Sequence, residues 1–154
     1  MNLLQNTVCN GDQASAIGNL ELLDRGKTGL LCSRQCPAAT ILEACDKFKL
    51  WAADPGMTIV SSFHSPVEQE CLRLLLRGKT GIIHCPAREI ETFRIPKEWR
   101  SAIASGRMLI ISPFCQKRPS RKTINLRNRF VADLADELYI PFALPGGNLQ
   151  QFVG

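Results

Sequence analysis

Short apolar runs alternate with stretches of helical periodicity along most of the chain. Five runs are typical of buried strands, at residues 28–33, 57–62, 80–86, 107–112 and 137–142. Apolar residues recur at helical spacing over 37–53, 65–78, 96–106 and from about 124 to 136. Continuously apolar strands that alternate with helices indicate a parallel sheet covered on both faces. We therefore predict an α/β fold, a Rossmann-like three-layer αβα sandwich with a mostly parallel sheet.

The chain is long enough to bury a full hydrophobic core. Its 154 residues are 45% hydrophobic, which suits one domain. We predict a single domain over residues 1–154, with residues 1–20 as a possible extension that covers a sheet edge or mediates a contact. No secretory signal is evident, and no apolar run is long enough to cross a bilayer. We therefore expect a cytoplasmic protein without a membrane partner.

Seven cysteines raise the question of disulfides or metal. Their number is odd and several lie in apolar runs, which favours buried thiols in a reducing compartment. We expect Cys32, Cys45 and Cys85 to be buried. Cys32 with Cys36, and His84 with Cys85, lack the ligand spacing of closed zinc sites. We predict no metal site and no cofactor.

The segment RGKTG occurs twice, at 25–29 and 77–81, and its Gly-Lys-Thr resembles part of a nucleotide-binding phosphate loop. A phosphate loop follows a strand and opens a helix, so that the helix N-terminus meets the phosphates. Both copies here follow a helical segment and precede a strand. Glu21 and Arg73 also stand where the motif requires its first glycine. We interpret both segments as helix ends with a glycine at the cap.

Positive charge is concentrated in one part of the chain. The net charge is +5, and the segment from Lys117 to Arg129 holds six cations and no acid. Such a segment suits an anionic partner, but it is equally compatible with a solvated loop. Arg127 and Arg129 fall near the predicted start of the last helix, where unpaired N–H groups and the helix dipole disfavour cations. A bound anion would compensate for that cost.

Polar residues follow the predicted strands. In an open parallel sheet, ligands bind beyond the carboxyl ends of the strands. Hydroxyls, amides, cations and flexible backbone at one edge are what phosphate binding requires. The candidates for phosphate or nucleic-acid binding are Ser33, Arg34, Ser61, Ser62, His64, Lys122, Arg127, Asn128, Arg129, Gly146 and Gly147.

Arg127 shares the apolar stripe of the last helix with Val131, so we expect it to face the sheet edge. We interpret it as a phosphate ligand. In the alternative, it pairs with an internal carboxylate such as Glu68 and holds two loops together. Arg129 is either a second ligand or the salt-bridge partner of Asp133, four residues further on.

Several segments together resemble a known family. They are CSR after the first strand, SSFHSPVE after the second, LIISPF, and RNRFVADLADELYI followed by PGG. In this order they are similar to the Rossmann-like domain of the DNA-processing protein A (Smf) family, from about residue 28 onward. The family pattern has Gly where this chain has Cys32 and Ser62, and Glu68 stands at its acidic position.

The resemblance implies a bacterial cytosolic domain that binds single-stranded DNA in a basic pocket at the strand ends. It also implies a homodimer and delivery of DNA to the recombinase RecA. More distantly, the segment PGG at 145–147 is similar to part of a turn in the lonely-guy phosphoribohydrolases.

Three kinds of function follow from these observations. The first is binding of single-stranded DNA, although Phe63, Phe114 and His64 are few stacking residues for that task. The second is a sensor of, or an enzyme acting on, a nucleotide or phosphoribosyl ligand, with Glu68 or Glu89 as the catalytic carboxylate. The third is an assembly partner without a ligand. Because no complete acid–base set is visible, we predict no catalytic residues.

Overall fold

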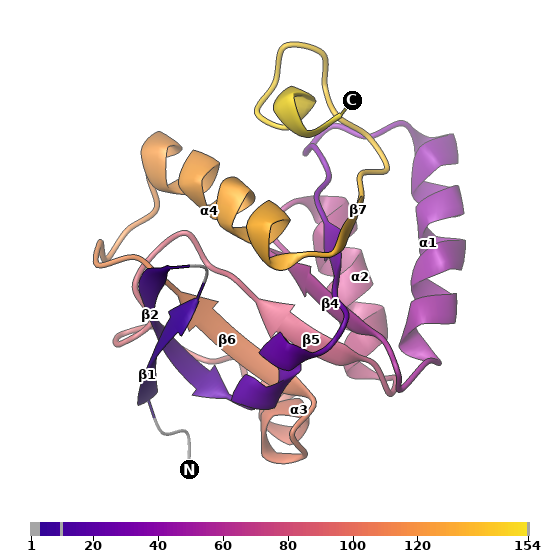
Figure 1. Cartoon of the computed structure of the whole chain (residues 1–154). Helices are drawn as coiled ribbons and strands as arrows, with labels where there is room; N and C mark the ends of the chain where they lie inside the picture. Colours follow the sequence, from indigo (N-terminus) through magenta and orange to yellow (C-terminus); the bar gives the residue numbers. More distant parts are fainter. Residues whose placement is uncertain (1–3, 10, 154) are drawn as a thin grey trace.

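The computed structural model describes residues 4–9 and 11–153. They include a seven-stranded sheet of order β1-β2-β6-β5-β4-β3-β7 (Figure 1). Its strands are β1 Leu4–Cys9, β2 Asp12–Gly18, β3 Thr28–Leu30, β4 Thr58–Ser61, β5 Gly81–His84, β6 Met108–Ser112 and β7 Glu137–Tyr139. The pairs from β7 through β3, β4 and β5 to β6 are parallel. The β1–β2 and β2–β6 pairs are antiparallel. The prediction of a mostly parallel sheet is confirmed.

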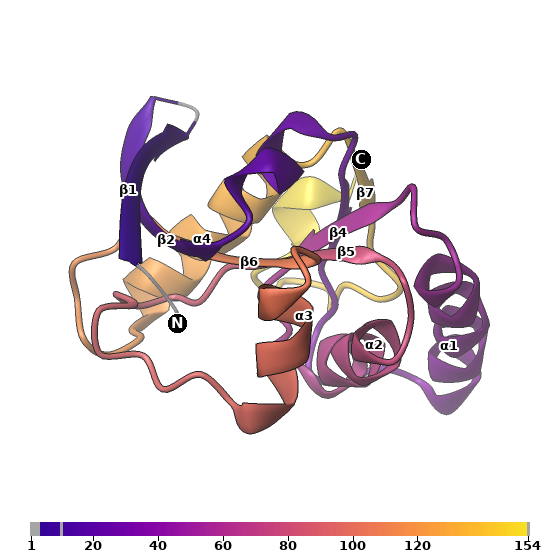
Figure 2. The ribbon, with the colours of Figure 1, turned by 90° about the horizontal axis from the view of Figure 1, so that it is seen from below.

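Helices cover both faces of the sheet. They are α1 Ala38–Ala52, α2 Pro66–Leu76, α3 Arg100–Ala104 and α4 Arg121–Leu134, with 3-10 turns η1 Leu20–Asp24, η2 Lys97–Trp99 and η3 Gln150–Phe152. Figure 2 shows α1, α2 and α3 on one face and α4 with η1 on the other, which confirms the three layers. Among the described residues, no helix combines the length and the apolar character that a bilayer span requires.

The central strands β4, β5 and β6 are buried along their whole length because both of their faces are covered. In β5, Ile82 faces the layer of α1 and α2, where it packs in the same cluster as Phe48. Its neighbour Ile83 faces the layer of α4 and clusters with Phe130 and Val131. Neighbouring side chains of a strand point to opposite faces, so a sheet covered on both sides gives an unbroken apolar run.

Residues 4–18, which we expected only as an extension, form the hairpin of β1 and β2. The hairpin joins the sheet because β2 pairs with β6. Its exposed and buried residues alternate over much of its length, so it contains no continuous apolar run of the kind that marks the central strands. Residues 1–3, part of the same predicted extension, lie outside the described residues.

The last helix begins earlier than predicted. It starts at Arg121, because Ser120 and Thr123 form a capping box in which each side chain accepts a hydrogen bond from the other's backbone N–H. Arg127 therefore lies in the second turn. The unpaired N–H groups belong to the turn of Arg121 and Lys122, so the expected dipole penalty on Arg127 and Arg129 is wrong.

Both RGKTG segments follow a helical turn and precede a strand, as predicted, after η1 and after α2. The expected glycine cap is wrong, however. The cap residues are Arg25 and Arg77, and neither Gly26 nor Gly78 has a positive φ. Gly78 is required for a different reason, since a Cβ there would lie 2.1 Å from the carbonyl oxygen of Ala52. The second copy thus marks a close approach between α1 and the end of α2.

The cysteines follow their apolar settings with one exception. Cys32 and Cys85 are buried as expected, whereas Cys45 is only half-buried because it lies at the edge of the core, against the cluster and not within it. Burial raises the pKa of Cys32 to about 12 and also raises the pKa of Cys85. Within the described residues, no group of three or more His, Cys, Asp or Glu side chains could hold a metal ion.

Candidate functional site

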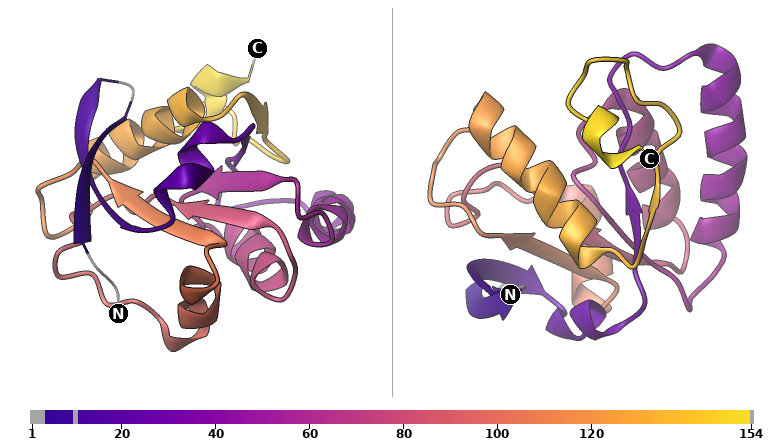
Figure 3. Two further views of the ribbon diagram at one scale, coloured as in Figure 1. Left: turned by 60° about the horizontal axis from the view of Figure 1, so that its bottom comes forward. Right: turned by 45° about the horizontal axis from the view of Figure 1, so that its top comes forward.

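A cavity of about 540 Å³ opens beyond the carboxyl ends of β3 and β4. Four segments enclose it: the loop after β3, the loop from β4 into α2, the first half of α4 and the C-terminal loop. Figure 3 shows the C-terminal loop beside the loop that leaves β3. The lining residues are Cys32, Ser33, Arg34, Gln35, Ser62, His64, Ser65, Glu68, Ile124, Arg127, Asn128, Leu144, Gly147, Asn148 and Leu149.

Arg127 is the most unusual side chain in this cavity. It lies on the buried stripe of α4 with Val131 and is only 5% exposed. Its Nε donates to Oδ1 of Asn128 at 3.1 Å. Among the described residues, its terminal nitrogens have no hydrogen-bond partner, and no carboxylate lies within ion-pair distance. Burial lowers the pKa of Arg127, and Glu68 nearby offsets part of that effect. A buried cation without an anion is costly, so this arrangement favours a bound anion.

Glu68 is held by other groups. Its Oε2 accepts from the backbone N–H of Cys32 at 2.8 Å. Its Oε1 accepts from the hydroxyl of Ser62 at 2.6 Å and from the N–H of His64 at 2.9 Å. The carboxylate therefore ties the loop after β3 to the loop after β4. The expected alternative, a direct ion pair between Arg127 and Glu68, does not form among the described residues.

Arg34 brings a second guanidinium to the cavity. The side chain is exposed, and its Nη1 lies 3.3 Å from Nε2 of His64. Burial lowers the pKa of His64, and the cations Arg127 and Arg34 lower it further. The neutral ring is therefore favoured, and its Nε2 can accept the hydrogen bond from Arg34.

The serine hydroxyls join the cavity walls together. Ser33 Oγ accepts from the N–H of Leu144 at 2.8 Å, and the Ser33 N–H donates to the carbonyl of Phe142 at 2.9 Å. These bonds fix the C-terminal loop against the loop after β3. The hydroxyl hydrogen of Ser33 stays available to a ligand, whereas that of Ser62 is used by Glu68.

The structure brings together seven of the eleven predicted residues. Those that line the cavity are Ser33, Arg34, Ser62, His64, Arg127, Asn128 and Gly147. They come from four segments that are far apart in the sequence, and they place two arginines, two serine hydroxyls, an imidazole and an amide around one space.

Two of the predicted cations lie elsewhere. Arg129 is two residues from Arg127, so it points to the other side of α4, where it donates to Gln151 at 3.3 Å. The expected ion pair between Arg129 and Asp133 is not formed among the described residues. Lys122 is exposed on the first turn of α4, away from the cavity.

Ser61 and Gly146 also lie outside the cavity. Ser61 is fully buried in β4, where its Oγ accepts from the N–H of Phe63 at 3.0 Å. Gly146 has a φ of 77°, which a glycine adopts without strain, but it is Gly147 that lines the cavity. Ser61 and Ser62 are neighbours in the chain, and so are Gly146 and Gly147. In each pair only the second residue faces the ligand space.

A smaller cavity of about 210 Å³ adjoins the first and shares Ser62, His64, Ile124 and Arg127 with it. His84 lines this second space and is buried against Phe63 and Trp99, with ring centroids 5.9 and 4.7 Å away. Burial, with Arg127 nearby, lowers the pKa of His84 to about 3. Phe63 has a φ of 49°, a strained conformation for a bulky side chain.

The sequence analysis did not predict the smaller cavity. It also did not predict that Gln35, Asn148 and Leu149 line the main cavity. No local signal marks Gln35 or Asn148, because their position depends on how the loops pack.

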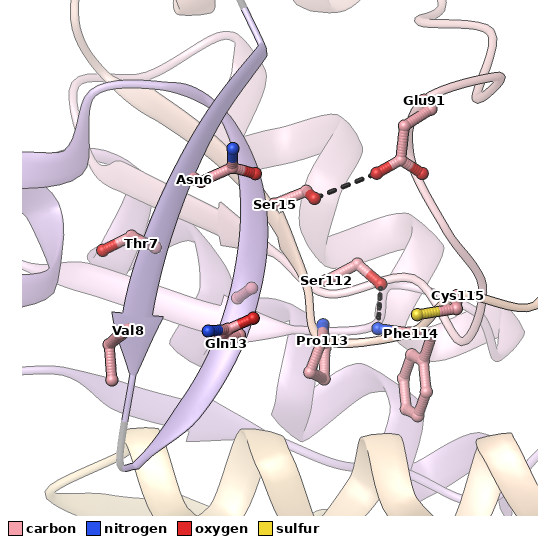
Figure 4. A pocket seen from close by; sticks show the side chains of 11 residues that line it. Asn6, Thr7, Val8, Gln13, Ser15, Glu91, Ser112, Pro113, Phe114 and Cys115 are labelled. Atoms are coloured by element: carbon pink, nitrogen blue, oxygen red, sulfur yellow. Dashed lines mark hydrogen bonds between the residues drawn. The ribbon is translucent and has the colours of Figure 1, made fainter.

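Another cavity, of about 670 Å³, lies beside the β1–β2 hairpin (Figure 4). Its lining contains Glu91, which accepts from Ser15 at 2.9 Å, and no cation. None of the predicted site residues lines it. The chemistry suited to an anion is therefore at the strand ends, in the smaller space.

The fold and the cavity at the strand ends define an α/β domain of Rossmann-like type with arginines at the carboxyl ends of parallel strands. Two solved structures share the fold. DNA processing protein A from Helicobacter pylori has a TM-score of 0.73 and 19% identity, over 96% of this chain and 72% of that one. DNA processing protein A from Streptococcus pneumoniae has a TM-score of 0.65 and 18% identity, over 83% of this chain and 45% of that one.

The chain therefore has the fold of the Rossmann-like domain of DNA processing protein A, as its sequence pattern suggested. The Helicobacter pylori protein binds single-stranded DNA. The chain spans less than half of the Streptococcus pneumoniae protein. No family model matches the chain, and a sequence comparison with curated proteins found no match.

Proposed function

We propose that this protein binds single-stranded DNA and that a backbone phosphate of the strand occupies the cavity between Arg34 and Arg127. The observation that carries the proposal is the guanidinium of Arg127, buried in the cavity wall without an anionic partner. The shared fold with a protein that binds single-stranded DNA supports it.

Each residue would supply a distinct contact. The terminal nitrogens of Arg127 would donate to two phosphate oxygens in the bidentate manner of guanidinium groups. Arg34 would close over the phosphate from the exposed side. Ser33 would add its free hydroxyl hydrogen and Asn128 its amide nitrogen, while Gly147 lets backbone approach closely. Glu68 would hold the two loops in place without touching the strand.

A nucleotide or phosphoribosyl ligand is the second candidate, because a cavity of about 540 Å³ has room for one nucleotide. Hydrolysis would need a free carboxylate. Glu68 already accepts three hydrogen bonds. Glu89 accepts from Thr92 and Arg88 and does not line the cavity. We therefore favour binding over catalysis.

The length of the ligand distinguishes the two candidates. We expect fluorescence anisotropy to show affinity rising with the length of a labelled oligothymidylate and little competition by AMP. Saturation by AMP, with no gain from longer strands, would support the nucleotide alternative. For a strand, log K should fall with log salt by roughly 0.7 per phosphate contacted.

Arg127→Ala tests whether the buried guanidinium of Arg127 binds a phosphate. Loss of a charge-assisted hydrogen-bond pair should weaken binding by about 1.5–3 kcal/mol, or roughly tenfold to a hundredfold, and should make the salt slope shallower. Arg129→Ala is the matched control, since it removes the same charge from the other side of the same helix. Equal effects of the two substitutions would show that only overall charge matters and would overturn the assigned site.

The resemblance also implies delivery of the strand to RecA in the cytoplasm, and we include that role in the proposal. Co-purification of RecA with the protein and an oligonucleotide would test it. Binding of the strand without RecA would leave the DNA site intact and remove the delivery role.

A further inference from the structure

Two cysteines bracket the part of a loop that brings Arg34 to the cavity. This loop joins β3 to α1, and it carries Cys32 and Cys36 four positions apart. The residues between them are Ser33, Arg34 and Gln35, and all three line the cavity at the strand ends. A covalent bond between the two sulfur atoms would therefore act directly on this wall of the cavity.

Both cysteine side chains turn inward from the loop. The chain bends at Arg34 and Gln35, which brings the residues on either side back toward each other. Cys32 is 4% exposed and belongs to the apolar cluster beneath the loop, and the half-buried Cys36 packs against the same cluster. The two thiols are hydrogen-bonded to each other. All seven cysteines of the chain are free, so this pair is in the dithiol form.

The loop is held firmly at one end only. The N–H of Cys32 donates to Glu68 at 2.8 Å, and the N–H of Ser33 donates at 2.9 Å to a carbonyl of the segment after β7. Among the described residues, no backbone hydrogen bond holds residues 34–36. A force between the two sulfur atoms will therefore move Cys36 and the residues just before it, while Cys32 stays in place.

We propose that Cys32 and Cys36 form a reversible disulfide, and that its formation withdraws Arg34 from the cavity. Bond formation draws the sulfur atoms from hydrogen-bond contact to covalent distance. This shift pulls the free part of the loop toward Cys32, so the guanidinium of Arg34 leaves its position over the phosphate, a consequence that rests on the proposed function. In a reducing compartment disulfides are usually transient and regulatory, which suits a site of this kind.

The exposure of the two thiols sets the order of the steps. The oxidant is a small disulfide, which is reduced to two thiols while the protein pair loses two electrons and two protons. Solvent reaches Cys36, and its thiolate attacks one sulfur of the small disulfide and releases the other half as a thiolate. Cys32 then gives its proton to solvent and attacks the sulfur of Cys36, which releases the second thiolate. Burial, with the neighbouring thiol of Cys36, raises the pKa of Cys32 to about 12, so this closing step should become faster as the pH rises.

Peptide mapping tests whether the disulfide forms. A Cys115→Ser background removes the exposed thiol. The protein is incubated with oxidised glutathione, blocked with N-ethylmaleimide in urea and digested with trypsin without reduction. Trypsin cuts after Arg34, between the two cysteines, so the disulfide joins peptides 28–34 and 35–47. We expect mass spectrometry to detect this linked pair and to show its loss after treatment with reduced glutathione.

Two substitutions identify the linked cysteine. Peptide 35–47 also contains Cys45, which is half-buried like Cys36. The link should disappear in Cys36→Ala, and Cys36→Ser replaces that variant if it fails to fold. The link should persist in Cys45→Ser, the matched control. Absence of the linked pair without these substitutions, or a link that survives the loss of Cys36, would overturn the proposal.

Anisotropy with a labelled oligothymidylate tests the effect on the cavity. We expect the oxidised protein to bind about tenfold more weakly than the reduced protein, at the low end of the loss for a charge-assisted hydrogen bond. Cys36 does not line the cavity, so Cys36→Ser should bind equally well under both conditions. Equal affinity of the two forms, with the disulfide present, would refute the withdrawal of Arg34. Failure of the reduced protein to bind would refute the proposed DNA site, whereas the peptide map decides the disulfide independently.

Discussion

Glu68→Gln would show whether the loops around the cavity depend on one carboxylate. The substitution keeps the shape of the side chain and replaces one carboxylate oxygen by an amide nitrogen. Oε1 of Glu68 accepts two hydrogen bonds and Oε2 accepts one, from the N–H of Cys32. The glutamine will therefore place its oxygen at the Oε1 position and its nitrogen against that N–H, so that two donors face each other.

The expected cost follows from these bonds. An unsatisfied buried donor costs about 1–3 kcal/mol. The other two bonds lose their charge, at about 1 kcal/mol each on the same scale. Removing a buried charge relieves part of its desolvation cost. We expect a net loss of about 2–4 kcal/mol in the free energy of unfolding, or roughly 5–15 °C in Tm for a domain of this size.

Thermal unfolding followed by circular dichroism measures this loss. Glu70→Gln is the control on the same helix, because Glu70 forms an ion pair with Arg73 that is exposed to solvent and therefore contributes little to stability. If the two variants melt together, Glu68 does not hold the loops. If Glu68→Gln keeps its Tm but abolishes hydrolysis of a nucleoside monophosphate, Glu68 is catalytic and the enzyme alternative is correct.

Three further predictions concern backbone, protonation and thiols. Gly78→Ala should destabilise the fold by about 1–3 kcal/mol in a urea titration, because its Cβ would clash with the end of α1, while Gly26→Ala in the other RGKTG copy should be nearly neutral. The pKa of His64 lies below the usual value of about 6.5 and will rise beside a phosphate. DNA affinity should therefore increase as the pH falls through the range between the pKa of the DNA-bound protein and that of the free protein, and it should stay flat in His64→Gln. With a thiol reagent in native buffer, exposed Cys115 should react fast and buried Cys85 slowly, and equal rates would contradict the burial.

Arg127 shows what the helical spacing of residues can predict and what it cannot. Its spacing from Val131 predicted that it faces the sheet, and the structure confirms the burial of both. The start of the helix was predicted too late, because the spacing of apolar residues marks only the packed part of a helix. Its first turn is set by the hydrogen bonds that Ser120 and Thr123 exchange in the capping box. The burial of Arg127 was predictable, but the dipole argument attached to it was not valid.

The order of strands and helices, the two-sided sheet and the group of loops that carry polar residues were determined by the sequence alone, because they depend on neighbours within a few turns of the chain. Which of those residues meet was decided only by tertiary structure. Ser33 binds Leu144 across 111 positions, and Glu68 binds Cys32 across 36. A loop residue has no periodicity to fix its direction, so only the long-range packing of separate segments brings Arg34 and Gly147 to one cavity. Arg129 lies outside that cavity for a local reason, because two positions along α4 turn its side chain away from that of Arg127.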